Sequence, residues 1–157
     1  MNTHIKYMKQ CIALGKKAMS KGNPPVGALI VKNEQIVGIG IEAGKTSKII
    51  TKHAEIEAVN DAVQNNQLEN LKGCILYTSH EPCIMCSYVL RHYKVETIVY
   101  GANVDFVGGI TSDLKVMLTT NIPNWGRSPE IIGDILKEEC DNLTASYKTY
   151  LNNNYEK

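Results

Sequence analysis

Apolar residues recur at helical spacing at the start of the chain and then change to short β-rich runs. A first helix is predicted over residues 3–21, where the apolar positions are Ile5, Met8, Ile12 and Met19. A Gly-Asn-Pro-Pro turn ends this segment. Two β-rich runs follow, Val26–Val31 and Ile36–Ile41, and the polar residues between them predict a hairpin.

Strands and helices alternate in the rest of the chain. The pattern predicts a polar connection over 45–52, helices over 53–64 and 83–92, strands over 74–78, 95–100 and 130–132, and a short helix through Leu118 that Thr111 or Ser112 could cap. One face of a last helix carries Leu136, Cys140, Leu143, Tyr147 and Tyr150. Alternation of this kind is typical of a βαβ layout. Without a repeat or linker, we expect one domain over residues 1–157, with one sheet sandwiched by helices.

Composition narrows the class of protein. Hydrophobic residues make up 43% and charged residues 21% of the 157 residues, which are ordinary values for a globular chain. We see neither a secretion signal nor an apolar run long enough to span a membrane, so a cytoplasmic location without membrane association is the default expectation. Five cysteines is an odd number, and in a reducing compartment close cysteine spacing points to metal binding or catalysis.

The charges give no strong argument for a nucleic-acid partner. The formal net charge is +1, and the segment from residue 129 to 157 carries six acidic against three basic residues. Five lysines cluster in the first predicted helix, where a solvated face is the simpler interpretation: Lys6, Lys9, Lys16, Lys17 and Lys21.

Two segments carry the residues of a catalytic metal site. They are His53-Ala54-Glu55 and Pro82-Cys83-Ile84-Met85-Cys86. A Cys-x-x-Cys pair can place two thiolates on one metal when the first cysteine starts a helix, and Pro82 fits such a start. His53, Cys83 and Cys86 are three ligands for Zn²⁺, which is the count of a catalytic site with an open position for water. The metal would lower the pKa of that water from about 15.7 toward about 7.

Glu55 is the candidate catalytic acid and base. It lies two residues after His53, about 200° round the helix, so it should not share the metal but can reach the bound water. A redox Cys-x-x-Cys or a closed zinc knuckle is the structural alternative. A redox pair would not require His-x-Glu, and a closed knuckle would need His80 or His92 as its fourth ligand.

With these motifs, the chain resembles the cytidine deaminase-like superfamily, whose zinc deaminases carry the His-x-Glu and Pro-Cys-x-x-Cys pattern. It most resembles the branch of guanine deaminases, yeast-type cytosine deaminase and bacterial tRNA adenosine deaminases. Further similarity lies in Pro25-Val26-Gly27-Ala28, Leu76-Tyr77-Thr78-Ser79 before Glu81-Pro82-Cys83, and Val99-Tyr100-Gly101-Ala102. The resemblance implies a three-layer α/β/α sandwich with a five-stranded mixed sheet, one zinc per chain and a homodimer. Glu55 would pass a proton from water to the ring nitrogen and to the departing amine, releasing ammonia and leaving a carbonyl.

The expected class of substrate depends on the role of Glu42. Members of the branch carry asparagine eleven residues before the zinc histidine, where this chain has Glu42. An ionised carboxylate only accepts hydrogen bonds, so Glu42 would select substrate N–H groups or sugar hydroxyls. If the loop shifts by one residue, Glu42 is instead a solvated charge. We therefore favour a small heterocyclic amine, a guanine-like base or a nucleoside, although the C-terminal segment lacks the pattern expected of guanine deaminases.

Two other functions remain open. A tRNA-specific adenosine deaminase acting on an anticodon loop would need a basic rim beside the pocket. The acidic last helix argues against this function, whereas the five lysines are consistent with it. A non-catalytic binding protein would be expected to lose Glu55 or a zinc ligand, and this chain retains all four.

Four further residues are candidate substrate contacts. Ala54 and Glu81 lie within the motifs, and His80 either reaches the pocket or packs. Asp105 follows a strand end, where it could contact substrate or cap a helix. Trp125 could form part of a lid or simply pack. The three remaining cysteines are expected to be small buried hydrophobic residues: Cys11, Cys74 and Cys140.

Overall fold

The structure is a computed structural model, and it describes residues 2–155. Its elements are α1 (Thr3–Ser20), β1 (Gly27–Lys32), β2 (Gln35–Ile41), α2 (Gly44–Ser47), α3 (Ala54–Gln64), β3 (Cys74–His80), α4 (Ile84–His92), β4 (Thr97–Ala102), the 3₁₀ helix η1 (Val116–Leu118), β5 (Glu130–Ile132) and α5 (Lys137–Tyr155). Most predicted elements are therefore confirmed within a few residues, and the short strand at 130–132 has the predicted bounds.

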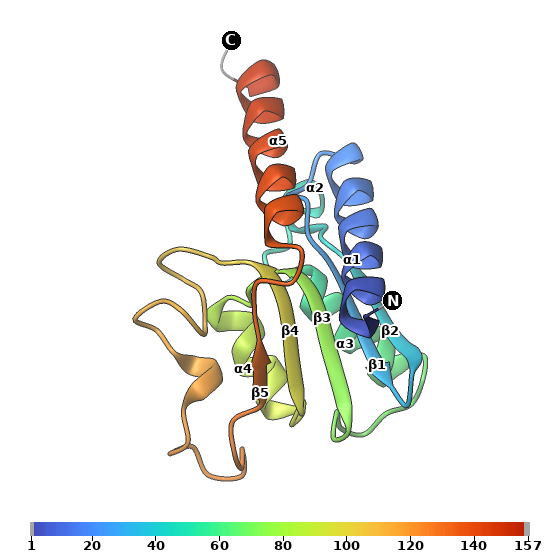
Figure 1. The fold of residues 1–157 in the computed structure, drawn as a ribbon, viewed down its shortest axis with the longest axis vertical. Helices are drawn as coiled ribbons and strands as arrows, with labels where there is room; N and C mark the ends of the chain where they lie inside the picture. Colours follow the sequence, from blue (N-terminus) through green and yellow to red (C-terminus); the bar gives the residue numbers. More distant parts are fainter. Residues whose placement is uncertain (1, 156–157) are drawn as a thin grey trace.

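The five strands form one mixed sheet in the order β2-β1-β3-β4-β5 (Figure 1). β1 pairs antiparallel with β2 and with β3, whereas β3, β4 and β5 are parallel. The β1–β2 hairpin turns at Asn33 and Glu34, whose φ angles of 48° and 62° are those of a tight two-residue turn. α4 connects the parallel strands β3 and β4, so the carboxyl ends of both strands meet at one edge of the sheet.

Helices cover both faces of the sheet, which confirms the three-layer α/β/α architecture. α1 and α5 pack on one face through residues such as Tyr7, Cys11 and Leu143. α3 and α4 pack on the other through Ala58, Val59 and Leu90. Cys11, Cys74 and Cys140 are fully buried, as predicted. The two cores hold the sheet rigidly between layers, so that residues at its edge have fixed neighbours.

Two glycines in β2 allow α3 to approach the sheet unusually closely. A Cβ atom on Gly38 would overlap the carbonyl oxygen of Ala58, and a Cβ atom on Gly40 would overlap that of Ala54. A side chain at either position would push α3 away from the sheet. Because α3 begins immediately after His53, this close packing also places His53.

The structure corrects two predictions in the loops. The connection over residues 45–52 contains the short helix α2. Neither Thr111 nor Ser112 caps a helix, and η1 covers only Val116–Leu118. The reason is that Thr111 donates its N–H and its hydroxyl group to the carboxylate of Glu81, while Ser112 donates to the carbonyl oxygen of Gly108.

α5 is the longest helix and extends beyond the other elements, so that its C-terminal half projects from the sandwich (Figure 1). Its first half supplies the buried residues Cys140 and Leu143. Within residues 2–155, every helix is too short or too polar to cross a membrane.

Candidate functional site

Three potential metal ligands converge where two helices begin. His53 is the N-cap residue of α3, Cys83 is the N-cap residue of α4, and Cys86 lies in the first turn of α4. Nδ1 of His53 lies 3.5 Å from Sγ of Cys83 and 3.5 Å from Sγ of Cys86. All three ligand atoms lie within 4.8 Å of one another. The two sequence motifs therefore meet in space.

The geometry and chemistry of this cluster fit a zinc ion. Two cysteines and one histidine are ligands that Zn²⁺ prefers, with bonds of about 2.3 Å to sulfur and about 2.0–2.1 Å to nitrogen. Tetrahedral bonds of about these lengths separate neighbouring ligand atoms by roughly 3.5 Å, which matches the distances from His53 to the two thiols. Among the described residues, these three form the only such cluster, so His53, Cys83 and Cys86 could hold one metal ion.

The surroundings prepare Cys83 to bind a metal. Hydrogen bonds from Cys86 and from His53, at the positive end of α4, lower the pKa of the Cys83 thiol to about 4. The same contact with Cys83 raises the pKa of His53 to about 9. The hydrogen bond with Cys83, together with burial, raises the pKa of Cys86. A thiolate at Cys83 is thus the favoured first ligand.

Glu55 lies beside the cluster but is not one of its ligands. Its side chain is 4% exposed, and Oε1 accepts a hydrogen bond of 2.9 Å from the hydroxyl of Thr78 in β3. Oε2 lies 3.6 Å from Sγ of Cys86. Burial raises the pKa of Glu55 to about 7. A carboxyl group with a pKa near neutrality can both take and return a proton at physiological pH.

A cavity of about 190 Å³ opens beside the cluster. Its walls are mostly apolar and include His53, Glu55 and Cys83 together with Pro24, Val26, Glu42, His80, Glu81, Val104 and Val107. Pockets for drug-sized ligands measure about 300–1,000 Å³. This cavity therefore suits one heterocyclic base and leaves the rest of a larger substrate outside.

Glu42 faces this cavity and is 6% exposed, which excludes the alternative that it is a solvated charge. Its Oε2 accepts a hydrogen bond of 3.2 Å from the N–H of Ala54, and its Oε1 accepts one of 3.3 Å from the N–H of Gly44. Burial raises the pKa of the carboxyl group. Glu42 therefore links the start of α3 to the segment that forms α2. Ala54 contributes its backbone N–H to this link.

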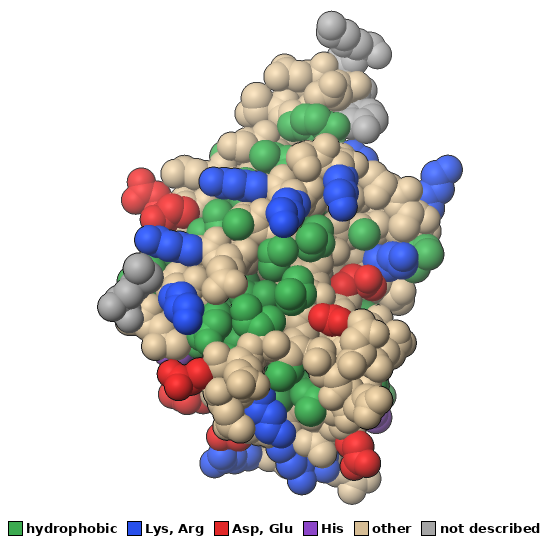
Figure 2. All heavy atoms as spheres, turned by 90° about the vertical axis from the view of Figure 1, so that its right-hand side faces the viewer, with side chains coloured by type: hydrophobic (Ala, Val, Ile, Leu, Met, Phe, Trp, Pro, Cys, Tyr) green, Lys and Arg blue, Asp and Glu red, His purple; other side chains and the backbone are tan. Residues whose placement is uncertain are grey.

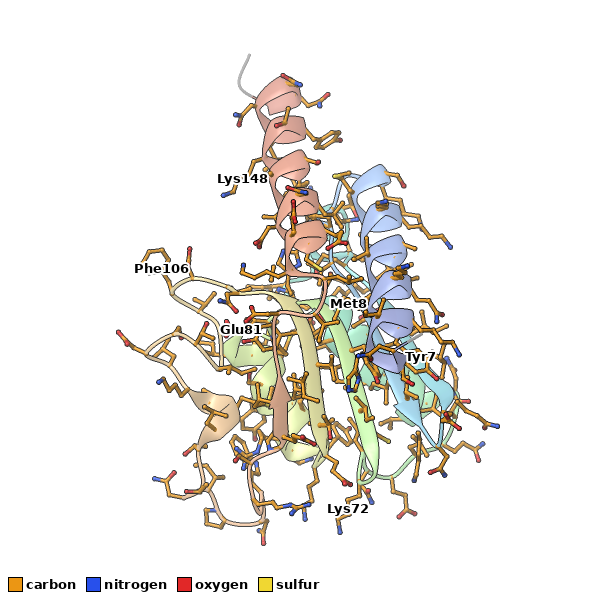
Figure 3. The ribbon with its side chains drawn as sticks, in the orientation of Figure 1. Tyr7, Met8, Lys72, Glu81, Phe106 and Lys148 are labelled. Atoms are coloured by element: carbon orange, nitrogen blue, oxygen red, sulfur yellow. The ribbon has the colours of Figure 1, made fainter. Side chains whose placement is uncertain are left out.

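His80 and Glu81 connect the cavity wall to other elements. Nε2 of His80 lies 2.8 Å from the hydroxyl of Thr144 in α5. Burial lowers the pKa of His80 to about 4. Glu81 is 1% exposed, and its carboxylate accepts hydrogen bonds from the N–H groups of Val104 and Thr111 and from the hydroxyl of Thr111. Glu81 thus organises the loop after β4, and Figure 3 shows it at the upper end of the sheet.

Two residues singled out in the sequence lie away from the cavity. Asp105 is exposed on the loop after β4, where its carbonyl oxygen accepts a hydrogen bond from Val107, and it does not line the cavity. Trp125 is 9% exposed and packs edge-on against Tyr88, with the guanidinium group of Arg91 5.0 Å from its ring. Of the two interpretations of Trp125, the structure supports packing.

Several residues around the cavity were not predicted from the sequence. Pro24, Val26, Val104 and Val107 supply most of the apolar wall, and Thr78 is the hydrogen-bond partner of Glu55. These residue types are common in any core, so their type alone does not distinguish them along the chain. The available signal is the similarity of two segments to the deaminase branch: Pro25-Val26-Gly27-Ala28 contains Val26, and Leu76-Tyr77-Thr78-Ser79 contains Thr78.

A second, more open cavity adjoins the first and is lined with lysines. Its volume is about 350 Å³, and it shares Glu42 and His53 with the first cavity. Lys45, Lys48 and Ile50 line the rest of it, together with Gly44. The lysines of α1 do not line this cavity. Figure 2 shows the side of the molecule that carries α1, where basic side chains lie around an apolar patch.

Comparisons with known proteins agree with this geometry. Residues 1–102 match the family described as the cytidine and deoxycytidylate deaminase zinc-binding region. The chain is 31% identical over 150 residues to a tRNA-specific adenosine deaminase of Aquifex aeolicus, covering 94% of this chain and 95% of that protein.

Solved structures give the same picture of the fold. One from work on A-to-I editing by tRNA:A34 deaminases has a TM-score of 0.80 at 22% identity, covering 88% of this chain and 98% of that one. A guanine deaminase of Bacillus subtilis has a TM-score of 0.61 at 34% identity, covering 66% of each chain. Taken with the Aquifex relative, the comparisons favour the tRNA alternative over the guanine-like substrate that we preferred from the sequence.

Proposed function

The chain belongs to the cytidine and deoxycytidylate deaminase family, and we propose that this zinc-dependent hydrolytic deaminase converts adenosine to inosine within the anticodon loop of a tRNA. The observation that carries the proposal is a pocket sized for one base that shares Glu42 and His53 with an adjoining cavity lined by Lys45 and Lys48. A base flipped out of an RNA loop would enter the pocket, and the lysines would meet the adjacent phosphates.

The acidic last helix argues less strongly against an RNA substrate than the sequence suggested. None of the acidic residues of α5 lines the cavity beside the metal cluster. Asp141 pairs with Lys137 at 2.7 Å, so its charge is partly compensated. The near-full-length similarity to a tRNA-specific adenosine deaminase includes this C-terminal part and also supports an RNA substrate.

The proposed chemistry is hydrolysis at the amine-bearing ring carbon. Zinc held by His53, Cys83 and Cys86 would make hydroxide available near neutral pH. Glu55 Oε2 would take one proton from water and deliver it to the adjacent ring nitrogen. It would then take the second proton from the hydroxyl group on the ring carbon and pass it to the departing amine. One water is consumed, the C–N bond breaks, ammonia leaves and a carbonyl remains. The buried setting that raises the pKa of Glu55 to about 7 suits it to both halves of this cycle.

A guanine-like free base is the second candidate, and Glu42 is the observation that favours it. Adenine presents ring nitrogens that accept hydrogen bonds, whereas guanine presents several N–H donors to a carboxylate. Glu42 faces the cavity and is nearly buried. In the RNA proposal, a ribose hydroxyl would have to be the donor to Glu42.

A panel measurement of ammonia release separates the two candidates. The zinc-loaded enzyme is given an anticodon stem-loop with adenosine at the wobble position, and separately adenosine, guanine, cytosine and their nucleosides. We expect the largest kcat/KM for the stem-loop, and conversion of its adenosine to inosine. A larger kcat/KM for a free base or nucleoside would reject the tRNA proposal and support a small-molecule substrate. The double variant Lys45→Ala/Lys48→Ala should raise KM for the stem-loop and reduce its salt dependence.

A further inference from the structure

Phe106 is the most exposed large apolar side chain among those described, at 88% exposure. It lies on the loop between β4 and η1, and its φ angle is +62°. The left-handed conformation is unusual for a bulky residue. Isolated exposed apolar residues are common on surfaces, so the position and support of Phe106 decide whether its exposure has a function.

The loop around Phe106 is held firmly on both sides. The N–H of Val104 donates to Glu81 Oε2 at 3.1 Å, and the N–H of Gly109 donates to the carbonyl oxygen of Pro82 at 2.8 Å. The carbonyl oxygen of Val107 accepts a hydrogen bond of 2.9 Å from the N–H of Ile84, at the start of α4. These contacts tie the loop to the segment that carries Cys83, so the ring of Phe106 is presented in a fixed place.

That place is the rim of the cavity beside the metal cluster. Val104 and Val107, on either side of Phe106 in the chain, both line the cavity. Phe106 itself points outward from the loop (Figure 3). Glu42 and His53, which also line this cavity, are shared with the cavity of Lys45 and Lys48. An exposed aromatic ring therefore lies next to two residues of the cavity wall, and the lysines lie in the adjoining cavity.

We propose that Phe106 stacks on the base of a nucleotide next to the target adenosine in the RNA. This inference rests on the proposed RNA substrate and adds how the part of the RNA outside the pocket is held. A cavity of about 190 Å³ encloses only one base, so the neighbouring bases of a splayed loop lie outside it. Stacking of single-stranded bases on aromatic rings is a general mode of RNA recognition. The lysines of the adjoining cavity match the phosphates of the same strand.

A double-mutant cycle between protein and RNA tests the contact. The zinc-loaded wild type, Phe106→Ala and Phe106→Tyr act on stem-loops with either an intact or an abasic nucleotide on each side of the target. Phe106→Ala should raise KM for the intact RNA at least about fivefold with little change in kcat, because stacking outside the pocket contributes equally to the ground state and the transition state. The abasic RNA should show the same rise with the wild type and no further rise with Phe106→Ala.

The remaining measurements complete the test. Phe106→Tyr keeps the ring and should restore wild-type KM. Ile39→Ala, at a 47% exposed residue of β2, is the control for loss of exposed apolar area and should have no effect. Quenching of 2-aminopurine placed beside the target should disappear in Phe106→Ala. The wild type could deaminate the stem-loop while the effects of Phe106→Ala and of the abasic nucleotide on KM are simply additive. In that case the stacking inference is wrong and the proposed function stands. If the wild type does not act on the RNA, both are overturned.

Discussion

Sγ of Cys83 lies 3.5 Å from Nδ1 of His53 although 30 residues separate them in the chain. Each residue is the N-cap of a helix, His53 for α3 and Cys83 for α4, and both helices pack on the same face of the sheet. Two helix starts at one edge of the sheet therefore bring an imidazole and a thiol together. Their positive ends also favour the thiolate form of Cys83.

Cys86→Ala should abolish zinc binding and activity. The variant leaves two protein ligands, and removing one of three ligands of an open tetrahedral site weakens binding strongly. Metal analysis should give one zinc per chain for the wild type and much less for the variant. Cys11→Ala, which removes another fully buried thiol, is the matched control and should keep its zinc. Full zinc content in Cys86→Ala would show that Cys86 is not a ligand.

Glu55→Gln should retain zinc but lower kcat by at least about a hundredfold, the scale expected when a positioned general acid and base is lost. Glutamine preserves the shape of the side chain and can accept the hydrogen bond from Thr78, but it cannot carry the proton. Glu57→Gln makes the same chemical change two residues further along α3 and serves as control. Near-normal turnover in Glu55→Gln would remove Glu55 from the mechanism.

Glu42→Asn should lower turnover of the preferred substrate and change the order of preference within the panel. The shorter amide cannot span the N–H groups of Ala54 and Gly44 as Glu42 does, and it presents a donor as well as an acceptor to the cavity. Loss of a buried charged acceptor corresponds to about 1–3 kcal/mol, or roughly a fivefold to hundredfold effect. Glu42→Gln keeps the length of the side chain and therefore separates the effect of losing the charge from the effect of shortening the side chain.

Thermal unfolding and zinc content of both Glu42 variants must accompany the kinetics, because Glu42 also stabilises the start of α3. An unchanged rate with an unchanged order of substrates would make Glu42 a purely structural residue.

His80 should make the folded protein less stable at acid pH. Burial lowers its pKa to about 4, although Asp141 acts in the opposite direction. The unfolded chain takes up this proton near pH 6.5, before the folded protein does. The stabilising contribution is therefore complete above about pH 6.5 and is lost as the pH falls toward 4, by roughly 3 kcal/mol.

Urea unfolding between pH 8 and 4 measures this loss. Protonation of the zinc ligands also destabilises the fold at acid pH. The informative quantity is therefore the difference in the free energy of unfolding between wild type and His80→Gln at each pH. Glutamine can keep a hydrogen bond to Thr144 but does not titrate in this range. The free energy of unfolding of His80→Gln should fall less steeply below pH 6.5. Parallel curves would show that His80 does not contribute.

Much of the fold was predictable from the sequence because its signals are local. The spacing of Ile5, Met8 and Ile12 predicts α1, and the alanines of α3 are one helical turn apart, since a helix repeats every 3.6 residues. The short strand at Glu130–Ile132 was predicted by its β-rich residues. His53, Cys83 and Cys86 could be chosen from the chain because zinc accepts few residue types at few spacings.

The strand order and the surroundings of the metal cluster depend on contacts between residues far apart in the chain. The sequence does not show which nitrogen of His53 faces the thiols, and only the packing of α3 beside α4 places Nδ1 there. Glu42 could equally have been a solvated charge until its two backbone partners were known. Such hydrogen bonds arise where separate segments meet.

The pocket and its rim come entirely from the tertiary structure. Val104 and Val107 are ordinary apolar residues in the chain, and their role arises because Glu81 and Ile84 hold their loop against the start of α4. The same anchoring presents Phe106 to solvent. Local patterns therefore sufficed for most helices and strands and for the candidate metal ligands, whose causes lie within a few residues. The substrate-facing surface required the folded chain, because it is built from loops whose positions depend on long-range hydrogen bonds and packing.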